Sequence, residues 1–330
     1  MKKLLLLSLL VLAACTSTES KDITLLDSSL SSILSADAKI EYLTDKDYVV
    51  SEGPVWSVKN NGLLFTDVDN NKMFLWQEGK GVSVYMDPSG YTGYAPTFEN
   101  GENGANGVML YNGQLVLCQH GDRRLAYVAG MEGTTPLFRT LVDSYEGKRF
   151  NSPNDLVASR IGDIYFTDPP YGLYNKETRS FDEELYRELP FQGVYRYSAS
   201  GELTLISKEM TRPNGIALSL DESYLYVNNS DRNNPVMMRY NIKNDWAGEV
   251  FFDGTEWSNK HEGGFDGMKV HSSGNIFTTA PNGLLVLSPT GELRGTINFG
   301  GPVTNCAFGP EEKYLYVTTF GRVARIKLQP

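Results

Sequence analysis

Asp163-Ile-Tyr-Phe-Thr-Asp168 is a short run of β-branched and aromatic residues, and five similar runs occur elsewhere in the chain. Residues of this kind favour β-strands. The other runs are Gly62–Asp67, Gln114–Gln119, Tyr224–Asn229, Asn275–Thr279 and Tyr314–Thr319. Their alignment points are Leu64, Val116, Tyr165, Tyr226, Phe277 and Tyr316. These points recur at intervals of 52, 49, 61, 51 and 39 residues, which is the size of a four-stranded blade.

The regions around these runs also have the pattern of strands. Each run is followed by a polar turn and a second apolar strand, such as Val194–Tyr197 or Leu284–Leu287. Sustained helical periodicity is scarce after residue 50. Repeats that bury their faces only against neighbours can close into a ring. The sequence therefore predicts an all-β, six-bladed β-propeller over residues 36–330, with the segment Ile40–Val50 joining the last blade to close the ring.

The first residues of the chain have the pattern of an export signal. Lys2 and Lys3 precede the apolar stretch Leu4–Leu12, which is too short to span a bilayer. Leu12-Ala13-Ala14-Cys15 resembles the bacterial lipobox, in which the cysteine is acylated. We therefore expect a lipoprotein signal peptide over residues 1–14, a lipidated Cys15 and a flexible tether over residues 15–35. The alternative is an ordinary cleaved signal that happens to contain a cysteine.

These features, together with the charge of the chain, limit its partners and location. The formal net charge is −10 at pH 7, whereas nucleic acids and anionic membranes require clustered Lys and Arg. No Gly-rich phosphate loop, CxxC pair or HExxH motif is present. Cys118 and Cys306 lie in apolar strands and are expected to be buried thiols without a disulfide. We expect a small-molecule partner, no obligatory protein partner, and an exported protein on the periplasmic side or cell surface, touching the membrane only through its lipid.

A second repeated feature lies ten to twelve residues before each alignment point, where a polar residue precedes another apolar strand. In order these residues are Glu52, Asn106, Asn154, Asn214, Asp266 and Asn305. Equivalent positions in a rotationally repeated fold lie on a circle, so these side chains should converge at the mouth of the central channel. Buried carboxylates and amides need partners, and a hard divalent cation with oxygen ligands supplies them. The alternative is that Asn, Asp and Gly recur there because they favour turns.

Four of these motifs resemble a known family. They are Glu52-Gly-Pro-Val-Trp56, Ser152-Pro-Asn-Asp155 with Phe166–Gly172, Arg212-Pro-Asn-Gly215 and Phe265-Asp-Gly-Met268. They are similar to motifs of the gluconolactonase, senescence-marker-protein and luciferin-regenerating-enzyme family, over roughly residues 45–325. The resemblance implies a six-bladed propeller that holds one divalent cation through Glu52, Asn154, Asn214 and Asp266. Calcium is the first expectation, with magnesium, manganese and zinc as alternatives.

The resemblance also implies which residues contact the substrate. Asn106 and His120 resemble pocket residues of bacterial members, and Asn305 is a looser match. In the animal members an Arg that helps hold a sugar lactone precedes the third-blade Asn by two residues. Ser152 stands there in this chain, and the nearby Arg149 is out of register. The resemblance therefore leaves specificity for aldonolactones open.

The predicted activity is metal-dependent lactone hydrolysis of the gluconolactonase type. The cation would polarise the lactone carbonyl and stabilise the oxyanion that forms when water adds. Asp266 would take the proton from that water, and His120 is the alternative base because its reference pKa is near neutrality. Two other functions are compatible with the same framework. One is an organophosphate or phosphotriester hydrolase, and the other is a non-catalytic, metal-bearing propeller that binds a glycan or a protein.

Overall fold

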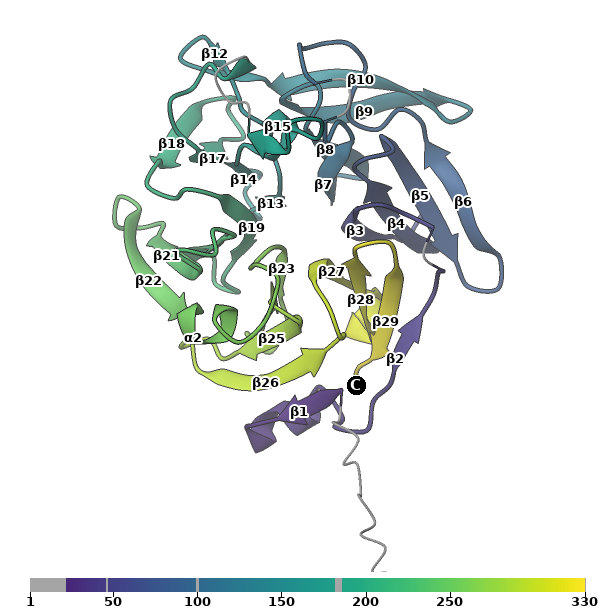
Figure 1. Ribbon diagram of the computed structural model, residues 1–330, viewed down its shortest axis with the longest axis vertical. Helices are drawn as coiled ribbons and strands as arrows, with labels where there is room; N and C mark the ends of the chain where they lie inside the picture. The colour runs from purple at the N-terminus through teal and green to yellow at the C-terminus, as the bar shows by residue number, and fades with distance from the viewer. Residues whose placement is uncertain (1–21, 46, 99–100, 182–185, 330) are drawn as a thin grey trace, which may run out of the picture.

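Six antiparallel sheets stand around a common axis in the computed structural model, which describes residues 22–45, 47–98, 101–181 and 186–329 (Figure 1). The prediction of an all-β, six-bladed propeller is therefore confirmed. The predicted signal peptide and Cys15 lie outside the described residues.

Each of the first three blades follows the chain from the axis outward. Blade one contains β3 (Ser51–Ser57), β4 (Gly62–Asp67), β5 (Lys72–Gln77) and β6 (Gly81–Met86). Blade two contains β7 (Ala105–Tyr111), β8 (Gln114–Gln119), β9 (Arg124–Glu132) and β10 (Thr135–Val142). Blade three contains β13 (Leu156–Ala158), β14 (Ile164–Asp168), β17 (Gly193–Tyr197) and β18 (Leu203–Ser207).

Blade four follows the chain outward in the same way, and blades five and six each add a strand from the start of the chain. Blade four contains β19 (Pro213–Leu218), β20 (Tyr224–Asn229), β21 (Val236–Asn241) and β22 (Ala247–Asp253). Blade five contains β23 (Met268–Val270), β24 (Ile276–Ala280), β25 (Gly283–Leu287), β26 (Leu293–Asn298) and β1 (Ile23–Leu25). Blade six contains β27 (Val303–Phe308), β28 (Tyr314–Thr319), β29 (Val323–Lys327) and β2 (Ile40–Tyr42).

The remaining elements are short and lie in the connections between these strands. Two small hairpins pair β11 (Ser144–Tyr145) with β12 (Lys148–Arg149) and β15 (Tyr174–Asn175) with β16 (Ser180–Phe181). The helical turns are η1 (Ser28–Ser32), η2 (Tyr171–Leu173), α2 (Thr255–Ser258) and η3 (Pro310–Glu312). None of the described helices is long and apolar enough to cross a membrane.

The ring is closed by the predicted segment. β2 pairs antiparallel with β29, the third strand of the last blade. Arg325 of β29 reinforces the pairing through a 2.7 Å ion pair with Glu41 of β2. The first and last parts of the chain therefore share one sheet, which fixes the six blades as a closed ring.

The described part of the predicted tether differs from the prediction. β1 pairs antiparallel with β26 and covers the outer edge of blade five. Leu30 and Leu34 are fully buried in the same apolar cluster as Phe277 and Val286. Burial of these apolar side chains, and pairing of an otherwise open sheet edge, explain why the segment is ordered. The folded domain therefore includes residue 22 onward, and does not begin at residue 36.

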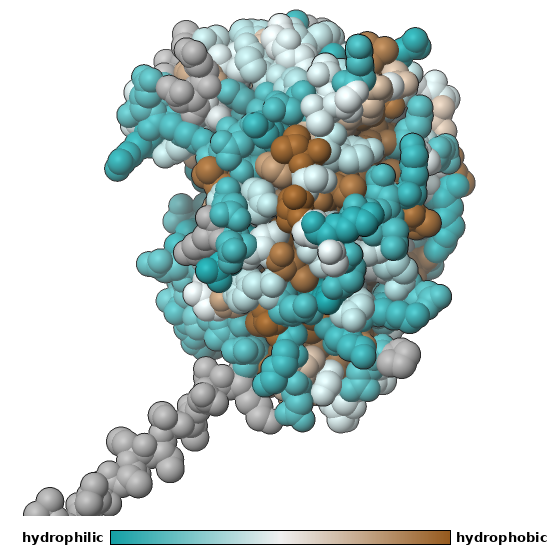
Figure 2. Space-filling view, turned by 90° about the vertical axis from the view of Figure 1, so that its right-hand side faces the viewer, coloured by the Kyte–Doolittle hydropathy of each residue, from teal (hydrophilic) through white to brown (hydrophobic). Residues whose placement is uncertain are grey.

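Apolar side chains fill the spaces between neighbouring sheets, in six clusters around the ring. Cys118 and Cys306 are buried in these clusters and are free thiols, as predicted. The outer surface on the side of β5 and β6 is mostly hydrophilic, with apolar side chains gathered in a band (Figure 2). The core therefore lies between the blades, which leaves the axis to polar side chains.

Candidate active site

A cavity of about 330 Å³ opens at one end of the propeller axis. Glu52, Asn106, Asn214 and Asp266 line it, and each comes from the start of the inner strand of a different blade or the residues just before it. Asn154 is buried next to them, before β13. The structure therefore brings five of the six residues that were predicted to converge on the axis to one end of it, as the rotational repeat requires. This circle of side chains is called the ring below.

Backbone hydrogen bonds between adjacent blades fix this ring of residues. The amide of Gly107, which follows Asn106, donates to the carbonyl of Asn154 at 2.6 Å. The amide of Gly267, which follows Asp266, donates to the carbonyl of Thr304 at 2.8 Å. In both cases the donor is the residue that directly follows a ring residue, and the acceptor is the carbonyl of the ring residue in the next blade. In blade six that position therefore belongs to Thr304.

This differs by one residue from the prediction for blade six. Asn305 was expected in the ring, but it follows Thr304 and occupies the position of Asp155 and of Gly267 in other blades. Asn305 does not line the cavity, whereas Thr304 does. The inner strands of blades one, two, four and six share a β-bulge at this place, and in the resulting register Thr304 corresponds to Asn106 and Asn214. The spacing of ten to twelve residues to the alignment point fits both Thr304 and Asn305, so the sequence pattern did not fix the register to one residue.

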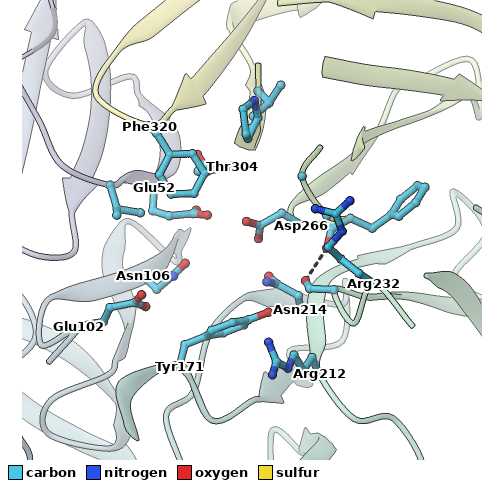
Figure 3. A pocket seen from close by; sticks show the side chains of 17 residues that line it. Glu52, Glu102, Asn106, Tyr171, Arg212, Asn214, Arg232, Asp266, Thr304 and Phe320 are labelled. Carbon is cyan, nitrogen blue, oxygen red and sulfur yellow. Dashed lines mark hydrogen bonds between the residues drawn. The ribbon is translucent and has the colours of Figure 1, made fainter. Parts of the chain in front are cut away.

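Two carboxylates face one another across the ring, those of Glu52 and Asp266 (Figure 3). Burial raises the pKa of Glu52 to about 7, and the charge of Asp155 adds to the effect. The pKa of Asp266 is raised well above its usual value, first by burial and then by the charge of Glu52. Two like charges this poorly solvated need a cationic partner to remain ionised together.

Three amides of the ring share an unusual feature. The side-chain oxygens of Asn106, Asn154 and Asn214 are buried and accept no hydrogen bond from any described residue. Buried acceptors without a donor are rare in native proteins. Carboxylate and amide oxygens are the ligands of a hard divalent cation, so this set of residues fits such an ion. Within the described ranges no three His, Cys, Asp or Glu side chains gather to hold a metal, so a cation here would depend on the amide oxygens.

His120 lies behind the ring and does not line the cavity. Its side chain is fully buried, and burial lowers its pKa to about 3. Its Nε2 atom lies 3.3 Å from Nδ2 of Asn154. An amide NH2 group can only donate, so Nε2 of His120 is the acceptor and the ring carries its proton on Nδ1. This contact orients the Asn154 amide and leaves its oxygen free.

A second layer of side chains lies directly below the ring. Nδ2 of Asn305 donates to Oε2 of Glu52 at 3.2 Å and to Oδ2 of Asp155 at 3.5 Å. Oδ1 of Asn305 accepts from Nζ of Lys269 at 3.3 Å and from the amide of Cys306 at 2.9 Å. Lys269 also lies 4.0 Å from Asp155. This network holds Glu52 from below, so Asn305 supports a ring carboxylate and does not contact the cavity.

Known proteins share this sequence and this architecture. The family model described as SMP-30/Gluconolactonase/LRE-like region matches residues 50–321. This chain belongs to that family. A gluconolactonase from Zymomonas mobilis is 38% identical over 312 residues, which cover 90% of this chain and 83% of that protein. The lactonohydrolase oryL of Aspergillus oryzae is 26% identical over 57% of this chain and 47% of its own length.

Solved structures of the SMP-30/Gluconolactonase/LRE-like type have the same fold. A gluconolactonase from Xanthomonas campestris is 27% identical, with a TM-score of 0.79 over 94% of this chain and 96% of that one. A luciferin-regenerating enzyme is 18% identical, with a TM-score of 0.66 over 88% and 95% of the two chains. At the latter identity the likeness supports the fold alone.

Ser152 stands where the animal members of the family have an Arg, and the structure shows what its side chain contacts. Its hydroxyl donates to the carbonyl of Pro169 at 2.6 Å and accepts from the amide of Gly172 at 2.9 Å. These bonds hold η2, the turn that brings Tyr171 into the cavity. Arg149 is paired at 3.9 Å with Glu188 and is absent from the cavity lining. Ser152 therefore shapes the wall of the site indirectly, and Arg149 does not replace the missing Arg.

Several other residues line the cavity. Tyr171 and Arg212 lie within the motifs that carry the resemblance, whereas Glu102, Arg232 and Phe320 lie outside them. Glu102 and Tyr171 form one side of the cavity, and Arg212 lies beside Tyr171 (Figure 3). Arg232 and Phe320 also line the cavity. Glu102, Arg232 and Phe320 lie in connections between strands, where the sequence has no periodicity that could indicate their direction.

Proposed function

We propose that this protein hydrolyses lactones with the help of one divalent cation held at the ring. The observation that carries the proposal is the set of three unpaired amide oxygens beside two facing carboxylates at the base of the cavity. The Zymomonas mobilis relative, which matches 90% of this chain, is named a gluconolactonase. A lactone is therefore the substrate class that the site and its relatives favour together.

The cation would be held by Glu52, Asn154, Asn214 and Asp266. When bound, a divalent cation supplies a Lewis acid that polarises the lactone carbonyl and stabilises the oxyanion. The all-oxygen donor set favours calcium, with magnesium or manganese next. The carboxylates of Glu52 and Asp266 balance the charge of such an ion, and Asn305 keeps one oxygen of Glu52 in a fixed direction through its 3.2 Å bond.

Asp266 is the residue proposed to accept a proton from the attacking water. Its carboxylate lines the cavity, where a substrate and a water molecule have access to it. The neighbouring Asn214 side chain partly offsets the rise in the pKa of Asp266. His120 is separated from the cavity by its position behind Asn154. A general base must lie within hydrogen-bond reach of the proton that it takes, so the geometry favours Asp266 over His120.

A substrate panel tests this function. Sugar lactones, unsubstituted lactones and a phosphotriester are each assayed with and without a chelator, and with calcium, magnesium, manganese or zinc restored. We expect lactone hydrolysis that the chelator abolishes and a divalent cation restores. Preference for the phosphotriester would favour an organophosphate hydrolase. A folded protein that turns over none of these substrates would favour a binding propeller and contradict the proposal.

We also propose that the protein is exported and anchored through an acylated Cys15, as the lipobox-like sequence indicates. Seven peptide units separate Cys15 from Asp22, where the described fold begins, and they span at most about 25 Å. Such an anchor would hold the outer edge of blade five close to the membrane surface. Cells grown with a labelled fatty acid test this. We expect label in the membrane fraction for the native protein and none for Cys15→Ser, and an unlabelled native protein would contradict it.

A further inference from the structure

Lys269 is a basic residue of the inner strand β23, three residues after Asp266. The mechanism described above does not use its charge. In the other five blades the residue three positions after the ring residue is apolar. These residues are Val55, Met109, Val157, Ala217 and Ala307. A lysine at this place is therefore not part of the repeat, and its contacts indicate what it does.

The ammonium group of Lys269 contacts residues that belong to two other blades. Nζ donates to Oδ1 of Asn305 at 3.3 Å and lies 4.0 Å from Oδ2 of Asp155. Nδ2 of Asn305 in turn donates to Oε2 of Glu52 at 3.2 Å. Because Oδ1 of Asn305 accepts from Lys269, its Nδ2 faces the two carboxylates. Lys269 therefore supports Glu52 through Asn305, and it lies beside a carboxylate that is not a proposed ligand.

The pair formed by Lys269 and Asp155 changes the charge near the ring. The side chain of Asp155 is only 4% exposed, whereas that of Lys269 is 32% exposed. A carboxylate this deeply buried is costly unless a cation lies beside it. Asp155 directly follows Asn154, so its charge acts on an ion held at the ring. Lys269 offsets this charge and leaves Glu52 and Asp266 to balance the ion.

We propose that Lys269 sets the charge selectivity of the ring, because by offsetting Asp155 it leaves two carboxylates to act on the ion, which suits a divalent cation. This inference rests on the cation site of the proposed function. Without Lys269 a third carboxylate would act on the ion. The Coulomb energy is proportional to the product of the charges, so the gain would be larger for a trivalent ion than for a divalent one.

The test compares the binding of calcium with that of terbium, a trivalent cation of similar size, by titration calorimetry. The quantity compared is the ratio of the calcium Kd to the terbium Kd. For Lys269→Met we expect this ratio to rise by about 10-fold, as for one more unit charge acting on the ion through several ångströms of protein. Lys269→Arg keeps the charge and should keep the ratio. Lys80→Met, on the exposed β5–β6 turn, is the matched control and should leave the ratio unchanged.

The ratio separates the charge of Lys269 from a merely structural role. Loss of the bond to Asn305 weakens the hold on Glu52 for both ions, and an equal loss of both affinities cancels in the ratio. An unchanged ratio in Lys269→Met would therefore overturn the inference, even if both ions bound more weakly.

A second variant tests the same charge from the other side of the pair. Asp155→Asn removes the charge that Lys269 offsets and should lower the ratio by about the same factor. The double variant Lys269→Met/Asp155→Asn restores the balance, so its ratio should return close to the native value. Circular dichroism checks folding, and Asp155→Asn carries the test if Lys269→Met does not fold. An unchanged ratio in Asp155→Asn, or a double variant that keeps the ratio of Lys269→Met, would overturn the inference.

Lactone assays separate this outcome from a failure of the proposed function. If the native protein hydrolyses lactones with a divalent cation but the variants leave the ratio unchanged, only the role of Lys269 is overturned. If the ratio shifts as expected but no lactone is hydrolysed, the lactonase proposal fails and the role of Lys269 stands. A native protein that binds neither cation would overturn both the role of Lys269 and the cation site.

Discussion

Two neighbouring layers of the propeller axis are built from consecutive residues of the same motifs, yet they differ in almost every chemical respect. The upper layer consists of Glu52, Asn106, Asn154, Asn214, Asp266 and Thr304. The lower layer consists of the residues that follow them, Gly53, Gly107, Asp155, Gly215, Gly267 and Asn305. The upper layer is polar in all six blades, whereas the lower layer has side chains in only two.

The glycines of the lower layer show why the layers differ. A Cβ atom at Gly267 would lie 2.0 Å from the side chain of Asn305, and one at Gly215 would lie 2.1 Å from the carbonyl of Asp266. Only Asp155 and Asn305 therefore fit below the ring, where they are fully engaged with one another and with Lys269. The amide oxygens of Asn106, Asn154 and Asn214 in the upper layer are unpaired, whereas the side chains of the lower layer are paired. The upper layer is therefore suited to binding a ligand and the lower layer to supporting it.

The largest effect is expected from Asp266→Asn, which turns an upper-layer carboxylate into an amide. We expect turnover of a lactone to fall by about two orders of magnitude or more, the scale of a lost general base. The fold and much of the metal affinity should remain, because an amide oxygen still faces the ring. Steady-state assays, with circular dichroism as the control for folding, measure the change. Full activity in the variant would transfer the base role to His120 or to bulk water.

The next effect tests whether the lower layer acts through the upper one. Asn305→Ala removes the bond that orients Glu52, so calcium affinity should fall by about 10- to 100-fold, as for loss of other residues that hold a metal ligand in place. Titration calorimetry measures it, and Asn214→Ala, which removes a proposed ligand, serves as the reference for direct loss. Unchanged affinity in Asn305→Ala would show that Glu52 keeps its position without support.

A third variant fills the lower layer. Gly267→Ala places a methyl group against Asn305, and we expect a loss of about 1–3 kcal/mol in the free energy of unfolding, as for other overpacked sites. Gly130→Ala is the matched control, because Gly130 lies in β9 with no atom within 4 Å of an added Cβ. Urea unfolding measures both. Equal stability of the two variants would show that the lower layer can accommodate a methyl group beside Asn305, contrary to this prediction.

The sequence was sufficient for the six blades, the closing strand and the position of Glu52, Asn106, Asn154, Asn214 and Asp266, because each follows from a repeat. It failed at Asn305, because Thr304 and Asn305 are both polar and both fit the spacing of ten to twelve residues to the alignment point. It also missed Glu102, which reaches the cavity from a connection that no repeat constrains. The tether was misjudged because Ile23, Leu30 and Leu34 are few among polar residues, although the edge of blade five covers them. The sequence repeat thus predicts the residues that the six-fold symmetry of the propeller places. The positions of the other residues depend on packing contacts that the repeat does not encode.

The smallest effect concerns Thr304, an upper-layer residue whose hydroxyl is already paired within the protein. Its hydroxyl donates to the carbonyl of Ser51 at 2.6 Å and lies 2.9 Å from Oγ1 of Thr318. Thr304→Val should therefore cost about 0.5–1.5 kcal/mol of stability and leave calcium affinity close to that of the native protein. Thr304→Ser keeps the hydroxyl and should lose less stability. If Thr304→Val instead weakened calcium binding as much as Asn214→Ala, an upper-layer residue would contribute to calcium binding even though its oxygen is already paired. That result would contradict the prediction that only the unpaired oxygens are ligands.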